Sequence, residues 1–341
     1  MVKSFEKTNR YTIHMPRNIL KVKIYSIRSG SRKESDVMSY ILQTHHLSKS
    51  IDGKALVTDV SMGVRKGEIY GFLGPNGAGK TTIMKMVTNL WKPTEGTIEL
   101  FGQKLTPTSY EVLKRMGSII EFPTFYEQLS GRENLVLHSE YMGYYHPGCV
   151  DEALEMLGMT DAGHKPVASY SLGMKQRLGI ARAILCKPEF LLLDEPTNGL
   201  DPAGMKQIRE LLKMLSEDYG ITVLISSHIL TEVESIADTI GIIHQGRMKK
   251  EVGMKEIEQA NLAYITVSVS NTKKAAFVLS ERLGLANFRL SDDGNIRIYD
   301  ERVSTGELAR AFSLGGVDVL ALGQKTETLE DYFLKLTSEV E

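Results

Sequence analysis

A glycine-rich stretch from Gly74 to Thr82 carries side chains whose types and spacing point to chemistry. It reads G-P-N-G-A-G-K-T-T and fits the pattern G-x-x-x-x-G-K-[ST]. It follows an apolar run, residues 69–73, that predicts a buried strand, and it leads into a predicted helix. Glycines let the main-chain N–H groups converge on one anion, and the helix adds the positive end of its dipole. The stretch therefore predicts a cradle for a nucleoside triphosphate.

Two side chains of this loop have defined parts in that chemistry. The ammonium of Lys80 is expected to reach the β- and γ-phosphates, and the hydroxyl of Thr81 is expected to ligate Mg²⁺. We expect the nucleotide to contact the loop through Gly74, Asn76, Gly77, Ala78, Gly79, Lys80, Thr81 and Thr82.

A second apolar run, residues 190–193, ends in two acids, Asp194 and Glu195. Buried parallel strands read as continuous apolar runs, and ligands bind at their carboxyl ends. Asp194 is therefore expected to meet the metal, directly or through water, and Glu195 to polarise an attacking water. His228 follows a third apolar run, residues 221–227. For this histidine a structural role and a role at the phosphates both stay open from position alone.

Ser171 precedes a predicted helix that runs to Ile184. Its hydroxyl can cap that helix, and Gly173 would permit the close approach of an anion. Ser-x-Gly before a helix is a common pattern, so these two residues are a weak signal by themselves.

Taken together and in this order, the motifs resemble the ATP-binding subunit of an ABC transporter. The resemblance covers about residues 40–246 and rests on the phosphate loop, Ser171–Lys175, L-D-E-P at 193–196, G-L-D at 199–201, and His228. It implies ATP and Mg²⁺ as cofactors. It also implies that Glu195 is the general base and that Lys80 and His228 act at the γ-phosphate.

The resemblance further implies a head-to-tail homodimer that holds two ATP molecules between its subunits. Ser171 and Gly173 would contact the γ-phosphate of the ATP held by the other subunit, and Asp201 would be an acid between the subunits. The chain would be peripheral at the cytoplasmic face of the membrane, with a permease on a separate chain as its partner. No nucleic-acid partner is expected.

Three positions depart from the common family pattern. Glu121 stands where a Gln is usual; it can accept from metal-bound water as an amide does, but it adds charge and loses the amide donor. We count it with Thr81 and Asp194 among the expected metal-site residues. Ile51 stands where an aromatic usually stacks on adenine, which predicts looser base selectivity. The acidic replacement, and Leu172 where a Gly is common, resemble the bacitracin and lantibiotic (ABC-2 type) exporter branch, which favours export of a peptide antibiotic.

Composition is that of a soluble globular protein. The 341 residues are 42% hydrophobic and 24% charged with a net charge of −1, which gives no general reason to expect nucleic acid. Two distant cysteines, Cys149 and Cys186, fit a reducing cytoplasm better than a disulfide framework. No apolar run approaches the roughly 18 residues of a membrane helix, so we expect any membrane role to come through a partner.

The predicted fold class is α/β, a P-loop ABC cassette with a mixed-sheet core and a helical subdomain, followed by a small α+β domain. We assign the domains as a basic extension at 1–37, the cassette at 38–250 with its helical subdomain at about 121–187, and an accessory domain at 260–341. The extension is expected to be disordered or non-native, with translation starting at Met38; a transit peptide or nucleic-acid arm stays open. The accessory domain has a βαββαβ pattern, which favours a ferredoxin-like fold. Within it we expect a capping box at Ser304 and Glu307 to open a helix, a last strand at 317–322, and a final helix at 328–336.

Two other functions stay open. A soluble ABC ATPase of translation or DNA repair typically has paired cassettes or a long coiled-coil insertion, whereas this sequence shows one cassette and no long heptad run. The basic extension is its only support. A small-molecule P-loop kinase would need an acceptor site and would not explain Ser171–Arg177 or His228.

Overall fold

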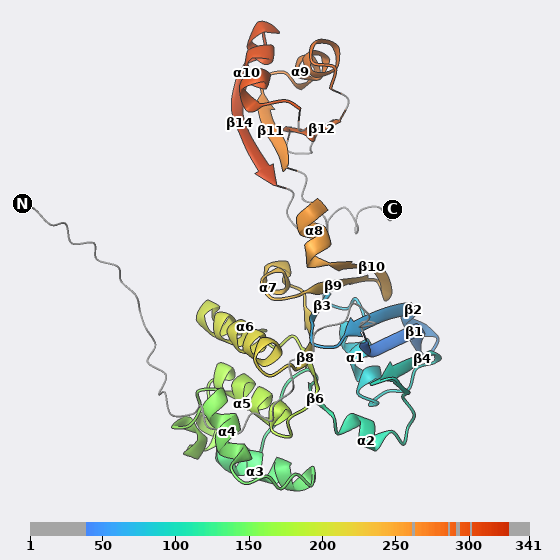
Figure 1. Cartoon of the computed structure of the whole chain (residues 1–341), viewed down its shortest axis with the longest axis vertical. Helices are drawn as coiled ribbons and strands as arrows, with labels where there is room; N and C mark the ends of the chain where they lie inside the picture. Colours follow the sequence, from blue (N-terminus) through green and yellow to red (C-terminus); the bar gives the residue numbers. More distant parts are fainter. Residues whose placement is uncertain (1–38, 261–262, 286, 291–293, 301, 327–341) are drawn as a thin grey trace, which may run out of the picture. The chain divides into compact units, whose positions relative to one another are not determined.

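The structure is a computed structural model that describes residues 39–260, 263–285, 287–290, 294–300 and 302–326 (Figure 1). The basic extension and the helix predicted at 328–336 lie outside these ranges.

A six-stranded sheet forms the core of the cassette. Its order is β10-β9-β3-β8-β7-β6, with β10 antiparallel to β9 and the other strands parallel. The strands are β3 (Ile69–Leu73), β6 (Met116–Ile119), β7 (Phe190–Asp194), β8 (Thr222–Ser227), β9 (Thr239–His244) and β10 (Arg247–Gly253). The carboxyl ends of β3, β8 and β7 therefore meet at one edge, where Leu73 pairs with Ser227 and Asp194 with Ser226.

The helices of the cassette connect and cover these strands. They are α1 (Lys80–Val87), α2 (Tyr110–Leu113), α3 (Gly131–Tyr141), α4 (Cys149–Met156), α5 (Leu172–Ile184), α6 (Pro202–Glu217), α7 (Leu230–Glu234) and α8 (Met254–Ala260). The predicted end of the helix after Ser171 is confirmed at Ile184. Among the described residues, no helix is long and apolar enough to cross a lipid bilayer.

Strand β7 shows why the central strands read as continuous apolar runs. All five of its residues are buried. Because side chains alternate between the faces of a strand, Phe190 and Leu192 pack with α1, whereas Leu191 and Leu193 pack with residues of α5 and α6. Both faces of the sheet are thus covered, as is usual for parallel strands.

A second, antiparallel sheet has the order β2-β1-β4-β5 and shares an apolar cluster with α1. Its strands are β1 (Tyr40–Ile51), β2 (Lys54–Arg65), β4 (Glu95–Leu100) and β5 (Gln103–Lys104). On the other side of the cassette core, α3 and α4 pack against α5, which packs on β6 (Figure 1). These helices lie in the region predicted to be helical.

The described residues between 263 and 326 form a separate antiparallel sheet of order β12-β13-β11-β14. Its elements are β11 (Ala263–Val269), α9 (Thr272–Phe277) continued by a π-helical turn (Val278–Arg282), β12 (Phe288–Leu290), β13 (Ile296–Ile298), α10 (Thr305–Leu314) and β14 (Val319–Thr326). The predicted ferredoxin-like order is therefore confirmed. A capping box joins Ser304 and Glu307 at the start of α10, as predicted.

The last strand of this sheet begins later than the sequence predicts. We expected a strand from Val317, but the N–H of Val317 donates to the carbonyl of Phe312, 2.9 Å away. This hydrogen bond closes the turn after α10, with Gly316 in a left-handed conformation (φ 64°). The strand therefore starts only at Val319.

Gly117 supports the packing of β6 on α5 and generates a stability prediction. A Cβ at this position would lie 2.1 Å from the carbonyl oxygen of Ala183, which is backbone and cannot move aside as a side chain can. Gly117→Ala should lower the free energy of unfolding by about 1–3 kcal/mol, measured by urea denaturation. The control is Ser118→Ala, at an exposed position on the same strand, which should change stability by less than about 0.5 kcal/mol. Equal stability of the two variants would contradict the packing argument.

Candidate active site

The phosphate loop lies between β3 and α1, as predicted. Gly77 and Gly79 have φ angles of 80° and 109°, which suit glycine and turn the loop back on itself. The loop forms one wall of a hollow of about 540 Å³. The residues that line the hollow are Lys54, Ala55, Leu56, Asn76–Thr82, Glu195, Asn198, Gln245 and Gly246.

The ammonium of Lys80 lies inside the loop and is only 5% exposed. It donates to the carbonyl oxygens of Gly74 (2.6 Å) and Pro75 (3.2 Å). It also forms an ion pair with Oε1 of Glu195 at 3.2 Å. A buried cation is costly unless oxygen atoms surround it, and here the loop and one acid supply them.

Asp194 is buried and receives two hydroxyl hydrogen bonds. The Thr81 hydroxyl donates to Oδ2 at 2.8 Å, and the Ser226 hydroxyl donates to Oδ1 at 2.6 Å. The structure therefore brings together two of the three residues predicted for the metal, Thr81 and Asp194, which come from distant motifs. Both carboxylate oxygens have fixed directions as a result.

Glu195 follows Asp194 in a left-handed conformation (φ 49°), which is uncommon for a residue with a side chain. Its N–H donates to the Ser226 hydroxyl at 2.9 Å. Its Oε2 lies 2.5 Å from Nδ1 of His228, the histidine just past β8. The carboxylate thus bridges His228 and Lys80 at the mouth of the phosphate loop. Backbone strain of this kind gathers at functional sites.

Other predicted residues lie apart from this hollow. Ser171 caps α5 by accepting from the N–H of Met174, and Asp201 caps α6 by accepting from the N–H of Gly204. Neither these two residues nor Gly173 line the hollow. The side chain of Leu172 packs closely against Gly199. A Cβ added at Gly199 would lie only 2.8 Å from Leu172 Cδ2.

Glu121 and Ile51 also lie outside the lining of the hollow. Glu121 follows β6 in a left-handed conformation (φ 62°), and its Oε1 lies 2.6 Å from Nζ of Lys85. Ile51, at the end of β1, is 39% exposed, whereas its neighbours Lys54, Ala55 and Leu56 line the hollow.

The sequence reading missed two supports of the site. Ser226 links both acids because it lies opposite Asp194 in the register of β7 and β8, which no local sequence pattern shows. Gly246, after β9, donates its N–H to the carbonyl of Ala78 (2.9 Å) and accepts from the N–H of Thr58 (2.8 Å). These two backbone bonds tie the phosphate loop to the second sheet.

The residues present suit Mg²⁺ and a triphosphate. Mg²⁺ prefers oxygen ligands and commonly takes one or two from protein, with water and phosphate completing its shell. Thr81 and Asp194 offer a hydroxyl and a carboxylate in hydrogen-bonding contact. The loop amides and the Lys80 ammonium offer the positive charge that phosphates require.

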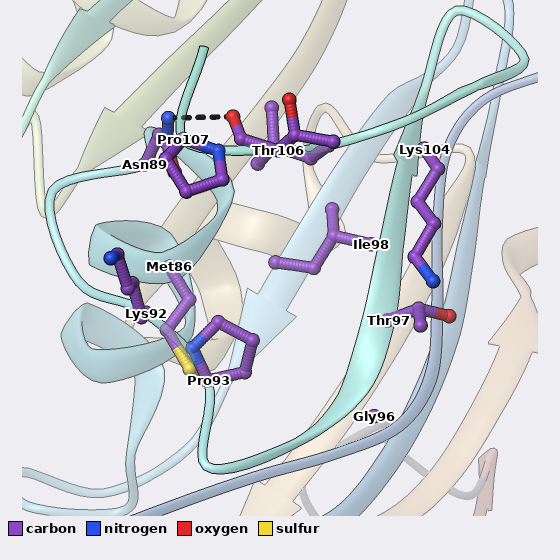
Figure 2. A pocket seen from close by; sticks show the side chains of 11 residues that line it. Met86, Asn89, Lys92, Pro93, Gly96, Thr97, Ile98, Lys104, Thr106 and Pro107 are labelled. Carbon is purple, nitrogen blue, oxygen red and sulfur yellow. Dashed lines mark hydrogen bonds between the residues drawn. The ribbon is translucent and has the colours of Figure 1, made fainter. Parts of the chain in front are cut away.

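A second hollow of about 200 Å³ lies at the C-terminal end of α1, beside β4 and β5. Figure 2 shows Met86, Pro93 and Ile98 among the side chains that face it, with a hydrogen bond from Asn89 to the carbonyl of Thr106. Its lining shares no residue with the first hollow. Its lining contains none of the residues predicted for the triphosphate or the metal.

A phosphate loop after β3, a histidine after β8 and two acids after β7 define a P-loop nucleoside triphosphatase of the cassette type. The family model described as ABC transporter matches residues 57–198. The chain belongs to the ATP-binding proteins of ABC transporters, whose members hydrolyse ATP to power transport.

Named relatives cover most of the chain. The uncharacterized ABC transporter ATP-binding protein YcbN of Bacillus subtilis (strain 168) is 54% identical, over 88% of this chain and 97% of YcbN. The bacitracin transport ATP-binding protein BcrA of Bacillus licheniformis is 43% identical, over 88% of this chain and 98% of BcrA. Among solved structures, the dimeric bacterial ABC transporter cassette MJ0796 has a TM-score of 0.56 and 25% identity, over 62% of this chain and 98% of that one.

The double role of Ser226 generates a kinetic prediction. Ser226→Ala removes a hydrogen bond to Asp194 and leaves the N–H of Glu195 without its acceptor. We expect kcat for ATP hydrolysis to fall about tenfold or more. The lost hydrogen bonds, worth roughly 1–3 kcal/mol, position the two acids and not the loop that binds phosphate. Nucleotide affinity should change little.

Ser216→Ala is the matched control, because Ser216 is also buried but its hydroxyl donates to the carbonyl of Gly67. Steady-state ATPase assays give kcat for both variants, and fluorescent-nucleotide binding gives the affinity. A Ser226 variant with the kcat of the control would contradict the positioning role.

Proposed function

We propose that this chain hydrolyses ATP to power export of a peptide antibiotic of the bacitracin type, through a separate membrane permease, at the cytoplasmic face. The observation that carries the proposal is the extent of the similarity to BcrA. The alignment with BcrA is 299 residues long, whereas the chain has only 260 residues up to the end of α8. The alignment therefore extends beyond the cassette into the C-terminal sheet. Shared cassettes are expected of any ABC transporter, whereas the shared accessory region supports a closer relationship.

The geometry supports specific roles in hydrolysis. Mg²⁺, when bound, would neutralise phosphate charge, and Thr81 and Asp194 would hold it. Glu195 would orient and deprotonate the attacking water, which its contact with His228 supports by fixing the carboxylate from one side. Lys80 would exchange its ion pair with Glu195 for the triphosphate. Glu121 would accept from water around the metal.

The proposed active form is a head-to-tail homodimer. Ser171 and Asp201 are exposed at the N-termini of α5 and α6, outside the hollow of their own chain. A helix N-terminus capped by a hydroxyl is suited to bind phosphate. The solved MJ0796 cassette, which this chain resembles, is dimeric. A second copy would complete each site by placing Ser171 and Gly173 opposite the phosphate loop.

Glu195→Gln tests the catalytic and the oligomeric proposals together. The amide keeps the shape of the side chain but cannot take the water's proton, so we expect hydrolysis to fall at least a hundredfold while ATP binding persists. With ATP and Mg²⁺ the variant should elute as a dimer in size-exclusion chromatography with light scattering.

Lys80→Ala is the companion variant. It removes the cation of the loop, so nucleotide affinity should fall and no ATP-dependent dimer should form. Turnover at the wild-type rate by Glu195→Gln would exclude Glu195 as the base, and unchanged affinity in Lys80→Ala would exclude the loop as the phosphate site.

Drug tolerance tests the proposed cargo. Co-expression of this chain with its proposed permease partner should raise the bacitracin concentration that a sensitive Gram-positive host survives. The Glu195→Gln variant with the same permease should give no increase, because export requires hydrolysis. Equal tolerance with and without the active pair would rule out bacitracin-type cargo while leaving the ATPase assignment intact.

A further inference from the structure

An ion pair joins α1 to the segment after β6, just outside the proposed nucleotide site. Nζ of Lys85 lies 2.6 Å from Oε1 of Glu121. The Lys85 side chain is 21% exposed and that of Glu121 is 58% exposed, so the lysine is the better fixed of the two partners. Lys85 has no part in the proposed hydrolysis.

The pair lies one helical turn from the proposed metal ligands. Lys85 follows Thr81 by four residues on α1. Both side chains are therefore on the same face of the helix, with their Cβ atoms about 5–6 Å apart. The Thr81 hydroxyl contacts Asp194. Glu121 lies near the same edge of the sheet as Asp194. It closely follows β6, which pairs in parallel with β7 so that Ile119 lies opposite Leu193.

A third side chain fixes the lysine. Nζ of Lys85 lies 4.9 Å from the ring centroid of Trp91. The backbone N–H of Trp91 donates to the backbone carbonyl of Lys85 at 3.0 Å. The ammonium therefore lies between an aromatic ring and a carboxylate, both of which attract it. The left-handed φ of Glu121 shows that its backbone is also held in an uncommon conformation.

We propose that Lys85 is a positioning residue for Glu121, and that its ammonium competes for this one carboxylate with the water around Mg²⁺. The inference rests on the proposed function, which places the metal at Thr81 and Asp194. An uncharged side chain at position 121 would offer Lys85 no ion pair. Lys85 thus keeps Glu121 beside α1 and offsets its charge, which makes the metal site weaker than its acids alone would make it.

The experiment measures the Mg²⁺ concentration that half-saturates binding of a fluorescent, non-hydrolysable ATP analogue to the full-length protein. Analogue anisotropy is one readout. Emission from Trp91, the only tryptophan of the chain, is the second and reports from beside the ion pair. Lys85→Met should lower the half-saturating concentration about two- to fivefold, because it frees the carboxylate.

The decisive comparison is the same substitution in a Glu121→Gln background. Lys85 lies near a dication site, so its charge alone lowers metal affinity whichever side chain is at position 121. A positioning role requires that Lys85→Met shifts the half-saturating Mg²⁺ concentration more with Glu121 than with Gln at this position. Only Glu can be released from an ion pair with Lys85. Lys85→Arg, which can keep the ion pair, should stay within about twofold of wild type.

Lys49→Met is the matched control. Nζ of Lys49 also faces the Trp91 ring, at 5.9 Å, but it donates to the carbonyl of Lys92 and not to Glu121. It should alter the baseline emission and leave the Mg²⁺ midpoint in place.

Equal shifts in the Glu121 and Gln backgrounds, or no shift in either, would overturn the inference while wild-type binding upholds the proposed function. Failure of the wild-type protein to bind the analogue at any Mg²⁺ concentration would overturn both.

Discussion

The buried ammonium of Lys80 is the constraint around which the site is built. A cation that is only 5% exposed needs oxygen atoms on several sides, and it finds them in two loop carbonyls and in Glu195. The loop must therefore fold back over the first residue of α1, which the left-handed glycines allow. The same requirement draws the end of β7 toward the end of β3, although β8 lies between them.

The strand between them supplies the links. Ser226, near the end of β8, contacts both acids, and His228 after it contacts Glu195. The site is thus assembled from neighbouring strand ends and not from one continuous segment. Rigid parallel strands that are buried on both faces hold such ends in register, because a slip would expose apolar side chains.

Much of this could be predicted from sequence where function depends on local motifs. The phosphate loop, the acids after an apolar strand and the helix cap at Ser171 each follow from residue types and near neighbours. The βαββαβ order of elements in the accessory domain also followed from strand and helix patterns. Ser226, Gly246 and the Lys85–Glu121 pair could not be found in this way. Each depends on which distant strands lie side by side, and that information is absent from local spacing. The delayed start of β14 depends on one hydrogen bond from Val317 that closes the turn after α10.

The contact of Leu172 with Gly199 has a mechanical consequence. Gly199 lies four residues after Glu195, and Leu172 directly follows Ser171. Close-packed atoms transmit displacement with little loss. In the proposed dimer, a shift of the chain after Glu195 would therefore press on the turn that carries the Ser171 hydroxyl. The contact of Leu172 with Gly199 would then couple the two nucleotide sites of that dimer mechanically.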